Sequence, residues 1–293
     1  MLPLAPGVYR FRDATGKVLY LGRATSLRRR VASYWGDLKD RRHLAPMVAK
    51  IARVEAVACD SAHEAAWLER NLLQARKPPW NRVDTGGQEV EVWIRLSEDQ
   101  RGPGLTAVHE CNETDRHFGP YLGGRQVRRA VSGLCRVLPL HYAGGALTGT
   151  RQDMARIRGI SEGDRATLAD TAVAVLARNP AAVSRLRSSL VARRDAASAI
   201  LAFEFAAKLQ EEIEAIDWVT AEQKVTGQEA TEYDIAGWSA GILVSFAIRK
   251  GRLVDWAQRA CQEATACRHL TGTPPEWTEF AQRNAELAAV LSA

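Results

Sequence analysis

The side chains best suited to chemistry gather near the start of the chain. They are three tyrosines, two arginines, one glutamate and one asparagine: Tyr9, Tyr20, Arg23, Arg30, Tyr34, Glu69 and Asn81. Guanidinium groups bind phosphate and the charge that develops on it during reaction. A phenol can transfer a proton, and one or two carboxylates suffice to hold Mg²⁺. Each residue alone is uninformative, but the ordered set predicts a site that cuts a phosphodiester with one metal ion.

Glu69 is the carboxylate of this set, and its surroundings are apolar. On a helix its neighbours three and four positions away are Ala65, Ala66, Leu72 and Leu73. A carboxylate on an apolar face is costly unless something pairs with it, and a divalent cation is a suitable partner. The alternative is a surface glutamate at the margin of a buried stripe. Spacing alone leaves both interpretations open.

Arg23, Arg30 and Tyr34 are spaced by seven and then four positions. On a helix this spacing puts them on one face, where they could grip the scissile phosphate and stabilise its transition state. Arg28 and Arg29 point elsewhere on the same helix. They are predicted to contact backbone phosphates, and a solvated basic run is the alternative.

Tyr9 and Tyr20 lie on adjacent strands of a predicted hairpin, so their hydroxyls can converge on one face of the sheet. A phenol near a metal and arginines can have its pKa lowered and can then accept a proton from the attacking water. Without that context, two strand tyrosines are half-buried packing residues. Asn81, taken alone, is a turn residue.

The elements that must position these side chains follow from periodicity and turn chemistry. Alternating residues on either side of an Asp- and Gly-containing turn predict a hairpin, and Ser61 with Glu64 predicts a capping box at a helix start. The predicted strands are 8–12, 18–22 and 54–59, and the predicted helices are 27–34, 45–51 and 61–75.

The rest of the chain is less regular. Alternation predicts a strand over 90–96 and two strands within 234–254, and apolar spacing predicts helices over 184–219 and 277–291. We therefore expect four segments: a domain of residues 1–97, a connector of 98–183, a helical segment of 184–219 and an α/β segment of 220–293. The predicted fold class is α+β, with a small three-stranded antiparallel sheet flanked by helices, then a mostly helical region with a short β segment.

The net charge of +6 is unevenly distributed over the 293 residues. Residues 1–82 hold 16 Lys and Arg against 7 Asp and Glu, so the remainder is slightly acidic. This basic first third predicts a polyanion partner, with Arg28, Arg29 and Lys39 on the phosphate backbone of DNA. A solvated basic face is the alternative.

The composition is ordinary for a soluble globular protein, with 46% hydrophobic and 25% charged residues. No apolar run approaches the roughly 20 residues that cross a bilayer, and the N-terminus has no secretory signal pattern. The five cysteines are odd in number and lack paired spacing. Together these features predict a reduced, cytoplasmic protein without a membrane partner.

Several of these motifs together resemble a known family. The segments Pro6–Tyr9, Leu19–Gly22, Leu68–Leu72 and Pro79–Asn81 are similar to the GIY-YIG nuclease domain. The similarity is to the version at the N-terminus of the bacterial excinuclease subunit UvrC and its short Cho-like relatives. The resemblance implies a three-stranded antiparallel sheet flanked by helices, one divalent cation (Mg²⁺ or Mn²⁺), and incision of DNA 3′ to a lesion.

The resemblance also implies a role for each site residue. Glu69 would be the metal ligand, Tyr20 would activate water, Tyr9 and Tyr34 would position water and phosphate, Arg30 would stabilise the pentavalent charge, and Asn81 would complete the site. Position 23 departs from the family, which usually has lysine there. Arginine keeps the charge but does not readily lose a proton, so Arg23 is predicted to bind phosphate or stabilise charge and not to act as a base.

Two weaker similarities concern cofactors and partners. Residues 118–121 and the following helix resemble the segment after the nuclease domain, but the family's cysteine cluster is represented only by Cys135, so no iron–sulfur cluster is expected. Residues 201–209 resemble the UVR helix, which pairs with the helicase subunit UvrB. Phe205 replaces the usual basic residue, and Gln210 with Glu211 stands where Arg-Asp is typical. These changes weaken the case for a UvrB-like partner, and an Ala-rich amphipathic helix packed within its own chain is an equal alternative.

We also expect no second, RNase H-like nuclease domain after the strand pair, hence one incision at most. The sequence hypothesis is a metal-dependent DNA endonuclease of nucleotide-excision-type repair, making a single 3′-side incision in damaged or nicked duplex by attack of water. A related possibility is a lesion-independent nuclease for branched or single-stranded DNA. The alternative from another class is a non-catalytic DNA-binding repair factor that recruits a partner through its UVR-like helix.

Overall fold

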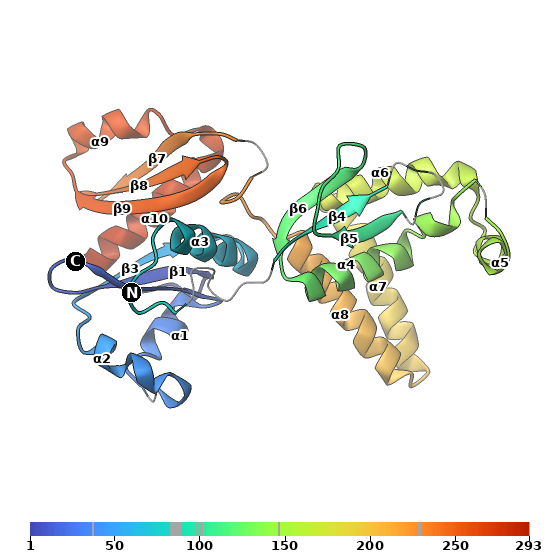
Figure 1. Ribbon diagram of the computed structural model, residues 1–293, viewed down its shortest axis with the longest axis horizontal. Helices are drawn as coiled ribbons and strands as arrows, with labels where there is room; N and C mark the ends of the chain where they lie inside the picture. Colours follow the sequence, from blue (N-terminus) through green and yellow to red (C-terminus); the bar gives the residue numbers. More distant parts are fainter. Residues whose placement is uncertain are drawn as a thin grey trace. The chain divides into compact units, whose positions relative to one another are not determined.

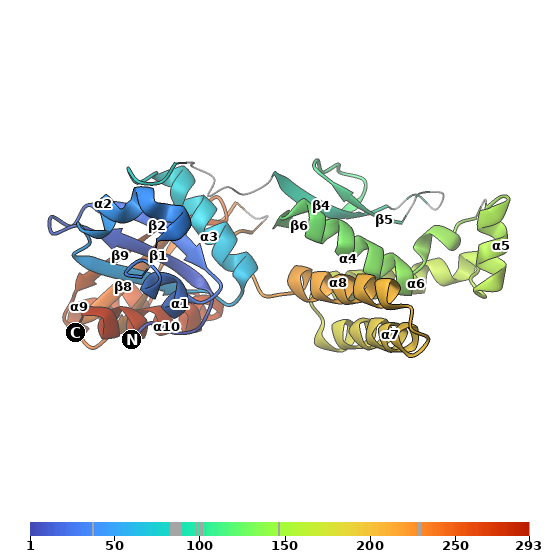
Figure 2. The ribbon, with the colours of Figure 1, turned by 90° about the horizontal axis from the view of Figure 1, so that it is seen from below.

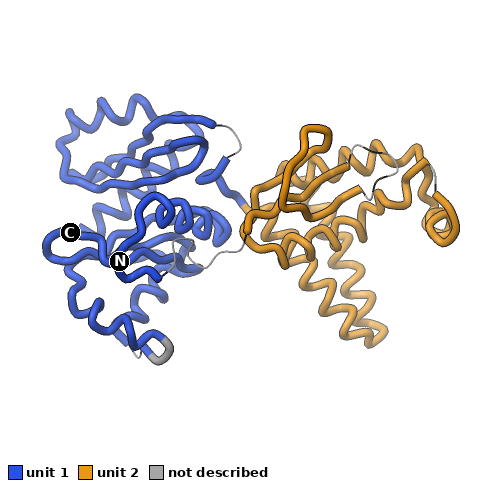
Figure 3. The backbone as a smooth tube through the Cα atoms, in the orientation of Figure 1, with its two compact units in different colours: residues 1–88, 222–293 blue, residues 89–221 orange. Residues whose placement is uncertain are grey.

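The computed structural model of the chain forms two compact units. Unit 1 comprises residues 1–88 with 222–293, and unit 2 comprises residues 89–221 (Figure 3). The residues described are 1–36, 38–82, 90–97, 99, 102, 104–145, 147–227 and 230–292, without the side chains of Lys39 and Asp40. Each unit is described by itself.

The first sheet of unit 1 is the predicted three-stranded antiparallel sheet. Its strands, in the order β2-β1-β3, are β1 (Gly7–Arg12), β2 (Val18–Ala24) and β3 (Arg53–Ala58). Asp13 closes the hairpin, because its Oδ1 accepts hydrogen bonds from the backbone N–H groups of Thr15 and Lys17 at 3.0 Å each. The α+β fold class predicted for this part of the chain is confirmed.

Helices border this sheet where the sequence predicts them. They are α1 (Leu27–Ala32), a 3₁₀ helix (Lys39–Leu44), α2 (Ala45–Val48) and α3 (Ala62–Ala75). The predicted cap of α3 is present: Ser61 Oγ accepts from the Glu64 N–H at 2.9 Å. The carboxylate of Glu64 completes the cap through Asp60, whose N–H donates to it at 2.7 Å.

The prediction that Arg23, Arg30 and Tyr34 share one helical face is wrong. Arg23 lies on β2, which stays paired with β1 through Ala24, opposite Gly7. The ladder hydrogen bonds hold this part of the chain extended, and α1 begins only after Ser26. Tyr34 follows the end of α1 in a turn, so the three residues come from three different local structures.

A second three-stranded sheet completes unit 1. Its strands are β7 (Tyr233–Ser239), β8 (Ile242–Arg249) and β9 (Arg252–Ala260), and it is followed by α9 (Glu263–Leu270) and α10 (Pro275–Ser292). Two strands turned at Lys250-Gly251 were predicted within 234–254, and that turn joins β8 to β9. The separate strand β7 is the one missed. Helix α10 packs on β7, β8 and β3, while α3 packs on β9, β2 and β1. The two helices therefore lie between the two sheets (Figure 1), and Figure 2 shows the same elements from below.

Side-chain contacts tie the C-terminal segment to the first sheet. Asn284 on α10 accepts from the N–H of Ala58 at 2.7 Å and donates to its carbonyl at 3.2 Å, which pairs it with the end of β3. Arg10 on β1 donates to the Trp256 carbonyl at 2.9 Å. The structure thus groups residues 222–293 with the first domain, whereas the sequence suggested a separate segment of 220–293. Local periodicity carries no information about such distant pairings.

Unit 2 is built on a third sheet, with strands in the order β5-β4-β6. Its elements are β4 (Glu91–Leu96), β5 (Leu105–Val108), β6 (Arg116–Leu122), α4 (Gly124–Val137), a 3₁₀ turn (Leu140–Tyr142), α5 (Thr150–Ile157), a 3₁₀ turn (Glu162–Asp164), α6 (Arg165–Leu176), α7 (Pro180–Ala199) and α8 (Phe203–Val219). The strand expected at the end of the first domain is therefore the centre of this sheet. The predicted connector of 98–183 and the helical segment of 184–219 belong to the same unit.

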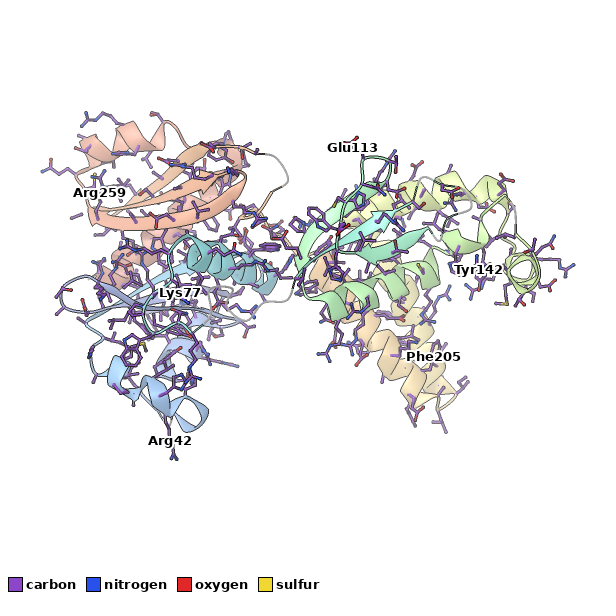
Figure 4. All side chains as sticks on the ribbon, in the orientation of Figure 1. Arg42, Lys77, Glu113, Tyr142, Phe205 and Arg259 are labelled. Atoms are coloured by element: carbon purple, nitrogen blue, oxygen red, sulfur yellow. The ribbon has the colours of Figure 1, made fainter. Side chains whose placement is uncertain are left out.

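The UVR-like segment forms the helix α8 and packs within its own chain. Its apolar face, including Leu209, Ile213 and Ile216, joins the core of unit 2 against α4 and α7. Within this buried face Glu212 forms an ion pair with Arg136 of α4 at 2.6 Å. Phe205 stays partly exposed on α8 (Figure 4). Among the described helices, none combines the length and apolar character that a membrane span requires.

Candidate nuclease site

Tyr9 and Tyr20 lie on the same face of the first sheet, as the hairpin predicted. In the β1–β2 register Tyr9 is opposite Gly22 and Tyr20 is opposite Phe11, so all four positions share one face. The ring centroids of the two tyrosines are 6.3 Å apart. Gly22 makes this possible, because a Cβ at that position would lie 2.7 Å from the Tyr9 hydroxyl.

Tyr34 and Arg30 complete a cluster around the Tyr9 hydroxyl. The hydroxyls of Tyr9 and Tyr34 are 2.7 Å apart, and Arg30 Nε donates to the Tyr9 hydroxyl at 3.3 Å. Tyr9 and Tyr34 are almost fully buried, whereas Tyr20 is half-buried. Of the three phenols, Tyr20 is therefore the one that solvent or a substrate can reach.

Without a metal ion, the pKa values of Tyr9 and Tyr20 are raised, whereas the lowered value expected from the sequence assumed a metal beside the phenol. Burial raises the pKa of Tyr9, and the neighbouring Tyr34 adds to this shift, while Arg30 opposes it. Burial likewise raises the pKa of Tyr20, with Tyr34 and the nearby Glu69 carboxylate contributing. In the protein without a metal ion both phenols are therefore neutral at ordinary pH.

Glu69 is buried at the edge of β2 and not a surface residue. It is 6% exposed, and its carboxylate meets Arg23 twice. The backbone N–H of Arg23 donates to Oε1 at 3.2 Å, and the Arg23 Nε lies 3.1 Å from Oε2. These contacts hold the carboxylate of α3 at the free edge of β2, where its charge contributes to the raised pKa of Tyr20.

A basic pocket opens beside Arg23, the partner of this carboxylate. It has a volume of about 450 Å³ and lies between the end of β2 and α1. Its lining comprises three arginines and small polar residues: Arg23, Ala24, Thr25, Ser26, Arg29, Arg30 and Ser33. Arginines that converge on hydroxyl groups provide the donors that a phosphate group requires. Arg23 and Arg30 thus share a site although they do not share a helix.

Asn81 contacts the strand and not the tyrosine cluster. Its Oδ1 accepts from the Leu21 N–H at 3.0 Å, and its Nδ2 donates to the Leu21 carbonyl at 2.7 Å. The Asn81 amide thereby makes the two hydrogen bonds to Leu21 that a neighbouring strand would make at the free edge of β2. Asn81 fixes the backbone between Tyr20 and Gly22, so it holds the site in place from behind.

The residues predicted to contact DNA differ in their intramolecular contacts. Arg28 is exposed, and its Nε donates to the Leu2 carbonyl at 2.7 Å. Arg29 is exposed and lines the basic pocket. The side chain of Lys39 lies outside the described part of the chain. Arg41 was missed by sequence reasoning: its guanidinium lies 4.7 Å above the Tyr34 ring and donates to Ser33 Oγ at 3.0 Å.

The donor set fits one hard divalent cation held mainly by water and phosphate. No group of three or more His, Cys, Asp or Glu side chains suited to a metal occurs among the described residues. Glu69 is a single carboxylate beside a phosphate-sized basic pocket, and Mg²⁺ typically keeps several waters and binds through one or two carboxylates plus substrate phosphates. Glu69 is therefore the residue that would hold the ion.

A small antiparallel sheet that carries two tyrosines, an arginine cluster and one helix-borne glutamate defines a GIY-YIG domain. Residues 5–82 match the family described as the UvrC-like GIY-YIG domain. The N-terminal part of this chain is thus a UvrC-like GIY-YIG domain, and the resemblance inferred from the sequence is confirmed.

Curated relatives extend the similarity beyond that domain. The UvrABC system protein C of Symbiobacterium thermophilum is 29% identical over 276 residues, covering 87% of this chain and 42% of the relative. The Synechocystis protein of the same name is 31% identical over 271 residues, covering 86% and 43%. The chain therefore spans about two fifths of the length of the relatives it matches.

A solved structure is similar to part of the chain. It is the GIY-YIG N-terminal endonuclease domain of UvrC from Thermotoga maritima, described as bound to its catalytic divalent cation, magnesium. The identity is 28%, with 28% of this chain and 88% of that chain covered, and the TM-score is 0.25.

Proposed function

We propose that the chain is a divalent-metal-dependent endonuclease that cuts one strand of damaged or nicked DNA. The observation that carries this proposal is the buried carboxylate of Glu69 beside a basic pocket and a reachable tyrosine, Tyr20. A buried carboxylate is costly unless a cation pairs with it; Arg23 is that cation in the protein alone, and a divalent ion would be a second one when DNA phosphate is present. The match to UvrC-like domains supports DNA as the polyanion.

In the proposed hydrolysis the water oxygen bonds to phosphorus as the bond to the departing sugar oxygen breaks. Tyr20, in its ionised form, accepts the proton of the water, and the departing oxygen takes a proton from solvent. Arg30 and Arg29 bind the scissile phosphate and the negative charge that grows on it in the transition state. Tyr20 holds the attacking water through its hydroxyl, and Tyr34 and Arg30 fix the buried Tyr9 behind it. Glu69 would hold the metal ion, which would supply charge neutralisation, lower the pKa of a bound water and favour the ionised form of Tyr20 that burial alone disfavours.

We place the incision on the 3′ side of the lesion, as in the family that the domain resembles. One site of this kind, acting once, gives one cut. The ion is Mg²⁺ or Mn²⁺, because both accept oxygen ligands.

The test is cutting of a lesion-bearing or nicked duplex in Mg²⁺ or Mn²⁺, with the cut position mapped. Glu69→Gln should abolish cutting and leave DNA affinity within a few-fold of the parent protein, since the basic pocket is intact. Glu279→Gln, an exposed carboxylate on α10, is the matched control and should cut normally. Full activity of Glu69→Gln would remove the metal assignment.

A second candidate is a non-catalytic DNA-binding factor that recruits a partner. The exposed apolar residues at the α7–α8 junction favour it: Ile200 is 78% exposed, Leu201 71% and Phe203 62%. This candidate predicts DNA binding with no cutting in any divalent metal. The parent protein in the cutting experiment distinguishes the two.

A further inference from the structure

Glu69 already has a cationic partner within the protein. That partner is Arg23, which also lines the basic pocket. Arg23 engages both carboxylate oxygens, through its backbone N–H at 3.2 Å and through Nε at 3.1 Å. The Glu69 side chain is 8% exposed and the Arg23 side chain 40% exposed. The guanidinium is thus the solvent-accessible member of the pair.

The same guanidinium lines the basic pocket together with Arg29 and Arg30. Arg23 therefore has two possible acceptors, the carboxylate that it meets now and a phosphate group in the pocket. Guanidinium is suited to such an exchange, because its planar fork presents five donors and binds carboxylate and phosphate with the same geometry.

A divalent cation and the Arg23 guanidinium compete for Glu69. Both are positive, and like charges repel strongly at such short separation. A cation that approaches Oε2 must therefore displace Nε. The displacement is easier when a phosphate is present to receive the guanidinium, since the arginine then loses no charge-assisted hydrogen bond.

On the basis of the proposed metal role of Glu69, we propose that Arg23 is an exchangeable counter-ion that couples metal binding to DNA binding. In the free protein it neutralises Glu69 and weakens metal binding. A DNA phosphate in the pocket draws the guanidinium away, and the cation then binds Glu69 more tightly. By linkage, the metal strengthens DNA binding by the same factor.

The size of the effect follows from the exposure of the pair. Ion pairs with a partly exposed member change equilibrium constants by roughly two- to fivefold. Arg23→Gln, which keeps the backbone N–H contact but removes the charge, should therefore tighten metal binding in the absence of DNA by about that factor. The variant should also lose part of the gain in metal affinity that DNA produces.

The experiment measures Mn²⁺ binding to the whole chain by the paramagnetic resonance signal of free Mn²⁺, without DNA and then with a short undamaged duplex. Arg29→Gln is the matched control: it removes one positive charge from the same pocket, and Arg29 makes no ion pair with Glu69 among the described contacts. Glu69→Gln tests the metal site itself. Circular dichroism verifies that each variant is folded.

Tighter Mn²⁺ binding by Arg23→Gln than by Arg29→Gln, with reduced coupling to DNA, supports the exchange. Equal affinities in Arg23→Gln and Arg29→Gln would overturn it, because the effect would then be one of general charge. Weaker binding by Arg23→Gln would overturn it as well. Persistence of the Mn²⁺ site in Glu69→Gln would instead refute the proposed metal role, whatever Arg23 does.

Discussion

Gly22 lies directly across the β1–β2 ladder from Tyr9, and the Tyr9 ring occupies the space of a side chain at position 22. A Cβ there would lie 2.7 Å from the Tyr9 hydroxyl and 2.8 Å from Cε1 of Tyr20. Both distances are shorter than the van der Waals contact of a methyl carbon with oxygen or carbon. The glycine after Tyr20 is therefore required by packing: its missing side chain lets both phenols share one face of the sheet.

Gly22→Ala should destabilise unit 1 by about 1–3 kcal/mol, because overpacking a filled site forces side chains off their rotamers. Nuclease activity should fall further than stability alone accounts for, since the methyl group displaces both tyrosines. Urea denaturation and a cutting assay measure the two effects.

Gly36→Ala is the control for this substitution, because nothing lies within 4 Å of a Cβ at position 36. It should change the free energy of unfolding little. Equal stability of Gly22→Ala and Gly36→Ala would contradict the packing role of Gly22.

The first sheet and α3 were predictable because their signals are local. A Ser61 cap, alternating strand residues and an Asp-Gly turn each specify structure within a few positions. Local signals also placed Tyr9, Tyr20 and Glu69 on the elements that carry them. The pairing of β4 with β5 and β6, and the packing of α10 between two sheets, depend on contacts between distant segments, which a single sequence does not display.

The positions of the site residues likewise depend on contacts that the local sequence does not reveal. Arg23 was assigned to a helix because its spacing to Arg30 suits one, but ladder hydrogen bonds through Ala24 keep it on β2. Arg41 was not identified at all. It sits in a run of basic residues, and the turn of the 3₁₀ helix determines which of them meets Tyr34 while Arg42 projects outward (Figure 4).

Asn81→Ala should destabilise unit 1 by about 1–3 kcal/mol, because the Leu21 N–H and carbonyl would each lose their amide partner. Cutting should fall while DNA affinity is retained, since the arginines of the pocket are untouched. Thermal unfolding and a binding titration measure the two quantities.

Asn81→Asp separates the two hydrogen bonds. It keeps the acceptor for the Leu21 N–H but sets a carboxylate oxygen against the Leu21 carbonyl, so it should be at least as destabilising as alanine. A fully stable and active aspartate variant would show that Asn81 does not hold β2.

Arg29→Ala should reduce the salt dependence of DNA binding more than Arg28→Ala. Arg29 lines the basic pocket, whereas Arg28 donates to the Leu2 carbonyl and is less available to phosphate. Loss of one phosphate contact lowers the slope of log affinity against log salt by about 0.9. Binding titrations over a range of salt concentrations give the slopes. Identical slopes for the two variants would contradict the prediction that Arg29 contacts phosphate more than Arg28 does.

Glu55 and Arg10 join the first sheet to the C-terminal segment through a buried ion pair. Glu55 on β3 contacts the guanidinium of Arg10 directly and that of Arg12 at 2.9 Å. Arg10 in turn lies 3.9 Å over the Trp256 ring of β9 and donates to its carbonyl. Burial lowers the pKa of Arg10 to about 10, although Glu55 opposes the shift. The Glu55 carboxylate thus offsets the cost of burying the Arg10 guanidinium between the two sheets of unit 1.

The stability of this link should depend on pH. Burial alone would raise the pKa of Glu55, but Arg10 and Arg12 outweigh it and hold the pKa below its usual value. A lowered folded-state pKa contributes stability above the unfolded-state pKa of about 4.3, and this contribution is lost as the pH falls through the folded-state value.

Glu55→Gln should therefore cost about 3 kcal/mol or more at pH 7, because it leaves Arg10 buried without its counter-ion. The difference from the parent protein should shrink below pH 4, where the parent also loses the carboxylate charge. Urea denaturation of unit 1 at both pH values measures it, with the exposed Glu279→Gln as control. A difference that is the same at pH 7 and below pH 4 would mean that the charge of Glu55 does not hold the two sheets together.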